Sequence, residues 1–220
     1  LFRSSAASDV YKRQGTAEPN INNAKGVATL NMLKKLASLS NPDYLTHDSE
    51  AIKVEWESGK VALMTLWASR SGTLLDDEGD AKITAATKLT GPATVGGGNI
   101  PAATLWWDGF TLAKNRSDSD AEATFIALAH AASNKKMVAD AADQAVWLVE
   151  GFVPGPKSIG VIEAVKMGAK PYPMLPQMGL MHGALGSEIV EFLQGKESAE
   201  QALKDVEAAY ISKAKEQGFL

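Results

Sequence analysis

The feature that most constrains the fold is a mostly apolar run from Lys60 to Trp67 (KVALMTLW), which follows directly on a helical pattern. Asp48 is placed to cap a helix over Ser49 to Ser58, and Gly59 is placed to end that helix. A continuous apolar run of this length is typical of a strand buried on both faces, as the strands of parallel sheets are. The order of helix, glycine and buried strand therefore predicts an α/β fold built on a parallel sheet.

The rest of the chain alternates between helical patterns and short apolar segments. Capping residues and apolar residues at helical spacing predict further helices at about residues 23–39, 118–132, 134–142, 158–167, 184–194 and 198–216. Short strands are predicted over about residues 82–88 and 102–113. Two segments rich in glycine and proline, residues 91–101 and 147–156, separate these patterns and are the predicted crossing points between two parts of the molecule.

The first fourteen residues (LFRSSAASDVYKRQ) differ in character from the rest of the chain. They lack the apolar centre of a signal peptide and resemble the translated read-through of a sequencing adapter. We interpret residues 1–14 as a non-native scar and exclude them from reasoning about the fold. We therefore expect a fragment whose native N-terminal part, including any secretion signal, is missing.

Composition argues against several kinds of partner and cofactor. The net charge is -4 and no basic run interrupts it, so there is no electrostatic footprint for nucleic acid. The longest apolar stretches are far shorter than the roughly 18 to 20 residues that cross a bilayer. The chain has no cysteine, and no histidine pair or acidic loop has the spacing of metal ligands. Neither a metal nor a cofactor is predicted.

Groups suited to catalysis are sparse. No Gly-x-Ser-x-Gly elbow surrounds any serine, and there are three histidines. We interpret His47 and His130 as structural, whereas His182 comes after a proline-rich connection and is a candidate binding contact. The acidic cluster from Asp76 to Asp80 is interpreted as a solvated turn. A pair of carboxylates for glycoside hydrolysis stays open, because the separation of such a pair is spatial and not sequential.

The five tryptophans are the most informative side chains, and four of them stand at predicted strand ends or in a loop. An indole offers a large apolar face and one N–H donor, which suits stacking on a sugar ring, and neighbouring polar groups suit the hydroxyl rim. The aromatic candidates are Trp67, Trp106, Trp107 and Trp147, and the polar candidates are Arg70, Asp108 and Glu150. The alternative is that these aromatics fill ordinary core, although consecutive Trp106 and Trp107 on a strand would point to opposite faces.

Three segments together resemble a known family. They are WESGKVALMTLWASR (Trp56 to Arg70), DGFTLAKNRSDSDAEATFIALA (Asp108 to Ala129) and GFVPGP (Gly151 to Pro156). In this order, between an N-terminal helix and two C-terminal helices, they are similar to the C-terminal half of the extracellular solute-binding proteins of carbohydrate ABC importers. These are the maltose-binding-protein-like family 1 group, and the resemblance covers roughly Asn23 to Tyr210.

The resemblance implies the type II periplasmic binding protein fold, with two hinge-linked α/β lobes of which the first is incomplete here. Residues 15–100 would form the first part of the second lobe, residues 101–156 a return segment to the first lobe with its crossovers, and residues 157–220 the C-terminal helices of the second lobe. The family's ligand contacts map onto Trp67, Arg70, Trp107, Asp108 and Trp147. His182 matches the start of a helix in which the family often has an aromatic contact.

The predicted function is therefore the substrate-binding component of an ABC importer, which is not an enzyme. It would bind a sugar, oligosaccharide or polyol between two lobes in the periplasm and deliver it to a membrane permease, as a monomer when complete. Three alternatives stay open: a fragment of a carbohydrate-active enzyme, a protein that binds a glycerol-phosphate-type ligand through Arg70, and a module whose aromatics contact another protein.

Overall fold

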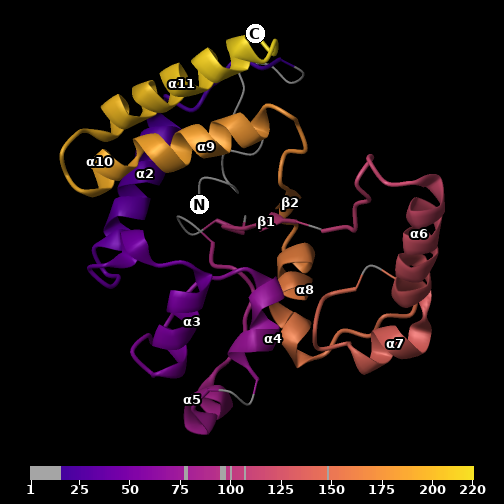
Figure 1. Cartoon of the computed structure of the whole chain (residues 1–220). Coiled ribbons are helices and arrows are strands. Elements are labelled where there is room, and N and C mark those ends of the chain that lie inside the picture. The colour runs from indigo at the N-terminus through magenta and orange to yellow at the C-terminus, as the bar shows by residue number, and fades with distance from the viewer. Residues whose placement is uncertain (1–15, 77–78, 95–97, 100, 107, 148) are drawn as a thin grey trace. The chain divides into compact units, whose positions relative to one another are not determined.

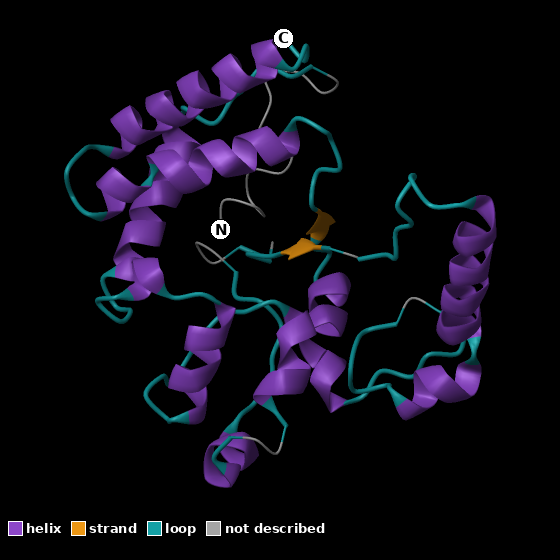
Figure 2. Cartoon of the chain, in the orientation of Figure 1, coloured by secondary structure: helices purple, strands orange, loops and turns teal. Residues whose placement is uncertain are grey.

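The computed structural model describes residues 16–76, 79–94, 98–99, 101–106, 108–147 and 149–220. Helices dominate this part of the chain, and a small parallel sheet of two strands accompanies them (Figures 1 and 2). Contacts divide the chain into two compact units. Unit 1 contains the residues up to His47 together with Ala93–Leu105 and Gly168–Leu220, and unit 2 contains Asp48–Pro92 and Trp106–Met167. The expected scar over residues 1–14 lies outside the described residues, and the lobe boundaries that the resemblance implies stay a prediction.

Unit 1 is built on helices whose first turns are capped by side chains. Asn23 accepts hydrogen bonds from two backbone N–H groups of the helix that it begins, and Ser198 accepts one from the N–H of Gln201. Both caps are polar residues directly before apolar helical patterns, so these helix starts agree with the sequence. The elements of unit 1 are α2 (Ala24–Ala37), η1 (Tyr44–Thr46), β1 (Thr104–Leu105), β2 (Lys170–Pro171), α9 (Met178–Glu188), α10 (Val190–Leu193) and α11 (Ala199–Glu216).

The core of unit 1 lies where α11 packs against α9 and α2. Leu203, Val206 and Tyr210 are fully buried and share one face of α11, as their helical spacing requires. The Tyr210 hydroxyl donates a hydrogen bond of 2.7 Å to the carbonyl oxygen of Ala17. The Glu207 carboxylate accepts bonds from the backbone N–H groups of two residues just before α2. The C-terminal helix therefore holds the first described segment of the chain in place.

The two strands of unit 1 pair in parallel, with Thr104 opposite Lys170 and Leu105 opposite Pro171. The N–H of Tyr172 continues the ladder by donating to the carbonyl oxygen of Leu105 at 2.9 Å. The sequence predicted a strand over residues 102–113, and within that range the described strand is limited to Thr104–Leu105. Residues 108–113 have no strand assignment, so the predicted strand is confirmed only in part.

Unit 2 consists of short helices joined by irregular segments. Asp48 and Ser117 cap the helices that begin after them, as predicted, and Asn134 caps the short helix after it. Gly59 ends the first helix with a φ of 71°, a conformation that favours glycine. The elements are α3 (Ser49–Glu57), η2 (Ala68–Arg70), α4 (Ser71–Leu74), α5 (Ala81–Ala86), α6 (Asp118–Ser133), α7 (Lys135–Asp140), η3 (Pro156–Ser158) and α8 (Ile159–Lys166).

The buried strand predicted for residues 60–67 is absent, and that prediction was wrong. The segment is irregular, and Leu63 in its middle is 86% exposed. A strand needs a neighbour that takes up its backbone N–H and C=O groups, and no described segment forms a ladder with these residues. The apolar content of the segment was therefore not sufficient to predict a strand, because no neighbouring strand is present among the described residues.

Two further predictions need correction. Residues 82–88 were expected to be a strand, but α5 covers most of them, because the Asp80 carboxylate caps the N–H of Lys82 and three alanines favour helix. The helix expected from residue 184 begins six residues earlier, at Met178, and breaks at Ile189 before α10. His182 therefore lies inside α9 and not in an irregular segment.

Among the described helices, none combines the length and the apolar character that crossing a bilayer requires.

Candidate functional site

The turn over residues 67–71 presents two of the predicted binding side chains together. Trp67 precedes the 3-10 turn η2, and its carbonyl oxygen accepts a hydrogen bond of 2.9 Å from the N–H of Arg70. Trp67 is 52% exposed, which leaves much of its indole open to solvent. Ser71 is buried, and its hydroxyl donates to the carbonyl oxygen of Lys157 at 2.5 Å. The turn is thereby fixed to η3, directly before α8, so Trp67 and Arg70 lie three residues apart on an anchored segment.

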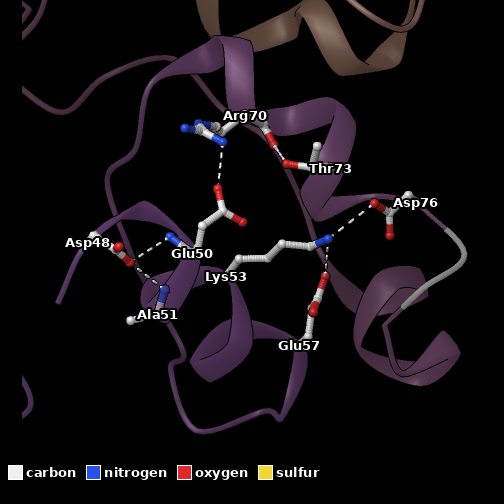
Figure 3. A network of polar contacts seen from close by, with 8 residues as sticks. All are labelled: Asp48, Glu50, Ala51, Lys53, Glu57, Arg70, Thr73 and Asp76. Carbon is white, nitrogen blue, oxygen red and sulfur yellow. Dashed lines mark hydrogen bonds and ion pairs between the residues drawn. The ribbon is translucent and has the colours of Figure 1, made fainter.

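The guanidinium of Arg70 forms an ion pair within unit 2. Its Nη1 atom lies 2.7 Å from Oε1 of Glu50, in the first turn of α3 (Figure 3). The Asp48 side chain, which accepts bonds from the N–H groups of Glu50 and Ala51, fixes that first turn. The Arg70 side chain is 42% exposed and that of Glu50 is 67% exposed. The pair therefore offers both a donor and an acceptor to a solvent-side ligand.

A second charged group lies farther along α3. The Lys53 ammonium is 3.4 Å from Glu57 Oε1 and 3.4 Å from Asp76 Oδ2, and the Lys53 side chain is only 16% exposed (Figure 3). Glu57 Oε1 is buried and accepts no hydrogen bond from the described residues, so the lysine supplies its electrostatic compensation. The acidic turn from Asp76 was interpreted as solvated. Asp76 instead ties the end of α4 to α3, while residues 77 and 78 lie outside the described part.

Two other predicted contacts lie in unit 2. The indole N–H of Trp147 donates to the carbonyl oxygen of Ala141 at 2.9 Å, so its only donor is used within the loop and its ring is half-buried. Asp108 is exposed in an irregular segment. No hydrogen bond or ion pair among the described residues joins either of them to Arg70. Trp107 lies outside the described residues, so the predicted partnership of Trp107 with Asp108 stays a prediction.

His182 is exposed on α9 of unit 1. Its Nδ1 atom lies 3.3 Å from the hydroxyl of Tyr172, and the two rings are tilted with centroids 6.2 Å apart. This pair fixes Tyr172, near the start of the proline-rich connection (residues 170–177), against α9. A role of His182 in ligand binding stays a prediction.

Two further tryptophans, Trp56 and Trp106, differ in their contacts and exposure. The indole N–H of Trp56 donates to the hydroxyl of Thr87 at 3.1 Å, which fixes α3 to the segment after α5. Trp106 is 44% exposed. Trp56 was not a binding candidate, and its ring is half-buried. Trp67 and Trp106, which were candidates, are both too exposed to fill ordinary core.

Sequence reasoning missed an open hollow in unit 2 of about 570 Å³. It is lined by Leu89, Thr90, Gly91, Pro92, Ile159, Glu163 and Met167. A Cβ at residue 91 would lie 2.8 Å from the Cβ of Glu163, so glycine allows the loop to approach α8 this closely. A Cβ at residue 160 would lie 3.6 Å from the carbonyl oxygen of Thr90 and 3.8 Å from the Cβ of Ala68, so α8 approaches both this loop and the turn after Trp67. In the sequence, the Gly91-Pro92 pair indicates a loop, but it does not indicate that this loop lies against α8.

No protein-family model and no curated protein matches this chain. Among the described residues, no group of three or more histidine, aspartate or glutamate side chains is arranged to hold a metal ion. The turn over residues 67–71 carries an exposed aromatic side chain and an arginine that is paired with Glu50 of α3. Such groups can stack on an apolar ring face and exchange hydrogen bonds with hydroxyl groups.

Proposed function

We propose that this chain is part of the substrate-binding component of an ABC importer and that it binds a sugar, oligosaccharide or polyol. The class comes from the resemblance of its segments to family 1 solute-binding proteins. The proposal includes what that resemblance implies: the type II periplasmic binding protein fold, a periplasmic location and a membrane permease as partner. The chemistry comes from one observation: the exposed Trp67 lies in the same anchored turn as Arg70, whose guanidinium is paired with Glu50.

Each of these side chains has a distinct role in the proposal. The Trp67 face stacks on the C–H face of a sugar ring, a contact that is apolar and shape-dependent. The Arg70 guanidinium donates to a ligand hydroxyl oxygen, and the Glu50 carboxylate accepts from a ligand hydroxyl. A polyhydroxylated ligand satisfies both, because each hydroxyl group is a donor and an acceptor.

The proposed mechanism is binding without a chemical step. In a hinge-linked protein, a ligand that contacts both lobes binds the closed arrangement more tightly and so increases its population. A permease that recognises the closed arrangement then receives loaded protein. Trp107, Asp108, Trp147 and His182 are the further ligand contacts that the family resemblance supplies for this site.

The test is a titration of the purified 220-residue chain with maltose, glucose and glycerol, followed by tryptophan fluorescence and by calorimetry. Trp67→Ala should weaken the binding of the best ligand about tenfold, the size of an aromatic contact. The matched control is Phe125→Ala, which removes a 64% exposed aromatic on α6, and it should leave the affinity unchanged. Equal affinities in all three proteins, or no saturable binding of any of the three compounds, would refute the proposal. Release of a cleaved product would favour the enzyme alternative.

A further inference from the structure

The charge of Arg70 is already compensated by a neighbour whose position is fixed. Glu50 is held in the first turn of α3 by the Asp48 cap, and Arg70 is held by the turn that Ser71 anchors. Their Nη1 and Oε1 atoms are 2.7 Å apart. The other cation of this network, Lys53, has Glu57 and Asp76 as partners (Figure 3). Glu50 and Arg70 therefore form a pair of their own, with no net charge.

This pairing affects neutral and anionic ligands differently. A phosphate that approaches Arg70 must displace the Glu50 carboxylate or remain next to it, and like charges at this distance repel. A hydroxyl group can accept from the guanidinium and donate to the carboxylate without breaking the pair. The same two residues therefore favour a neutral polyhydroxylated group over a phosphate ester.

We propose that Glu50 is a specificity-determining residue that prevents anions from using Arg70. The proposal rests on the proposed function for its location in a ligand site, and it adds a residue that the sequence did not single out. It also separates two ligand classes that the sequence left open, because it disfavours the glycerol-phosphate-type ligand. Removal of the Glu50 charge converts Arg70 from a paired group into an anion-binding group.

The experiment compares inorganic phosphate binding by the full chain and by Glu50→Gln at low ionic strength, measured by calorimetry. The glutamine keeps the shape and removes the charge. We expect the phosphate affinity of Glu50→Gln to rise by up to about fivefold, the size of one exposed charge interaction. The double variant Glu50→Gln with Arg70→Gln should lose this gain, which attributes it to the guanidinium and not to the start of α3.

The matched control is Glu122→Gln, which removes an exposed carboxylate on α6 that has no ion pair among the described residues. Its phosphate affinity should equal that of the unchanged chain. Circular dichroism spectra that superpose for all variants establish that they are folded alike. Equal phosphate affinity in Glu50→Gln and Glu122→Gln, or a gain that survives the loss of Arg70, would overturn the proposal.

The two proposals fail in different ways. A chain that binds no maltose, glucose or glycerol refutes the proposed function, while the phosphate titrations still decide the role of Glu50. A chain that binds a sugar through Trp67 but shows no change in phosphate affinity on Glu50→Gln retains the function and loses this inference.

Discussion

The two units of this chain bury their apolar side chains to very different extents. In unit 1, Leu203, Val206 and Tyr210 are fully buried between helices. In the described part of unit 2, the buried apolar side chains are Leu74, Val138 and Ala164. Large apolar side chains of unit 2 stay exposed, among them Leu63 at 86%, Val153 at 77% and Phe110 at 69%.

The difference arises from the pairing of the helices. The helices of unit 1 carry apolar faces that cover one another, which excludes water without a sheet. In unit 2 the longest helix, α6, has 16 residues and so exceeds α2 and α9 in length, yet it has no buried residue. Several of the described contacts of unit 2 are polar, such as the Ser71 bond to Lys157 and the Lys53 ion pairs. Hydrophobic burial therefore stabilises unit 1, whereas polar contacts have a larger share in holding unit 2 together.

The largest expected effect tests the core of unit 1. Leu203→Ala removes a fully buried side chain from α11 and should lower the free energy of unfolding by about 2–5 kcal/mol, through lost burial and the cavity that remains. Leu63→Ala, the same substitution at an 86% exposed site in unit 2, should change it by less than about 0.5 kcal/mol. Urea unfolding followed by circular dichroism measures both. Similar losses in the two variants would contradict the contrast between the units.

The next effect tests the polar contacts of unit 2. Lys53→Met leaves two carboxylates without their cation, and the side chains involved are 16% (Lys53), 18% (Glu57) and 28% (Asp76) exposed. We expect a loss of about 1–3 kcal/mol, because a buried carboxylate oxygen is left without compensation. Lys136→Met, which breaks an exposed pair with Asp140 whose side chains are 82% and 64% exposed, should cost no more than about 0.5 kcal/mol. Thermal melts at low salt compare them, and equal costs would show that burial of the first pair is irrelevant.

A smaller effect concerns the apolar surface of unit 2. The exposed side chains Leu63, Phe110 and Val153 should bind a hydrophobic fluorescent dye such as ANS when the chain is folded. Changing all three residues to serine should lower the dye fluorescence, but by no more than about half, since other apolar groups remain exposed. The comparison variant changes three exposed side chains of unit 1, Leu36, Leu39 and Leu45, to serine. Its dye fluorescence is compared with that of the unit 2 variant. A folded chain that does not increase dye fluorescence at all would contradict the exposure of unit 2.

The same contrast explains what the sequence could and could not predict. Helix starts at Asp48, Ser117 and Ser198 were predicted correctly, because a cap is a local contact between a side chain and the next backbone N–H groups. The strand over residues 60–67 was predicted wrongly, because strand formation depends on a partner strand elsewhere in the chain.

The candidate site divides along the same line. Trp67 and Arg70 are three residues apart, so the sequence placed them together, and the local turn does so too. Glu50 is twenty residues from Arg70, and nothing in its local pattern indicated that the two would pair. The hollow in unit 2 is lined by residues 89–92 and by residues of α8. The approach of these two segments, which are far apart in the sequence, cannot be predicted from hydrophobic periodicity.

The smallest effect concerns the rim of unit 1, where the helices meet solvent. Burial raises the pKa of Glu197, and the carboxylates of Asp205, Glu191 and Glu188 raise it further, against a hydrogen bond from the Phe192 backbone that lowers it. A carboxyl whose pKa is raised on folding is harder to ionise in the folded chain. The ionised form therefore costs stability at neutral pH, and this cost disappears as the pH falls below the ordinary pKa near 4.5.

Glu197→Gln should accordingly stabilise the chain slightly at pH 7, by less than about 0.5 kcal/mol, and should give no gain at pH 3.5. The control is Glu200→Gln, three residues later in the first turn of α11. That carboxylate is favourable to the helix dipole, so its loss should not stabilise the chain at pH 7. Thermal melts of both variants at the two pH values decide the matter. A gain for Glu197→Gln that is as large at pH 3.5 as at pH 7 would mean that packing, and not charge, is responsible. Even in the well-packed unit, then, the electrostatic contribution of the rim is small beside that of the core.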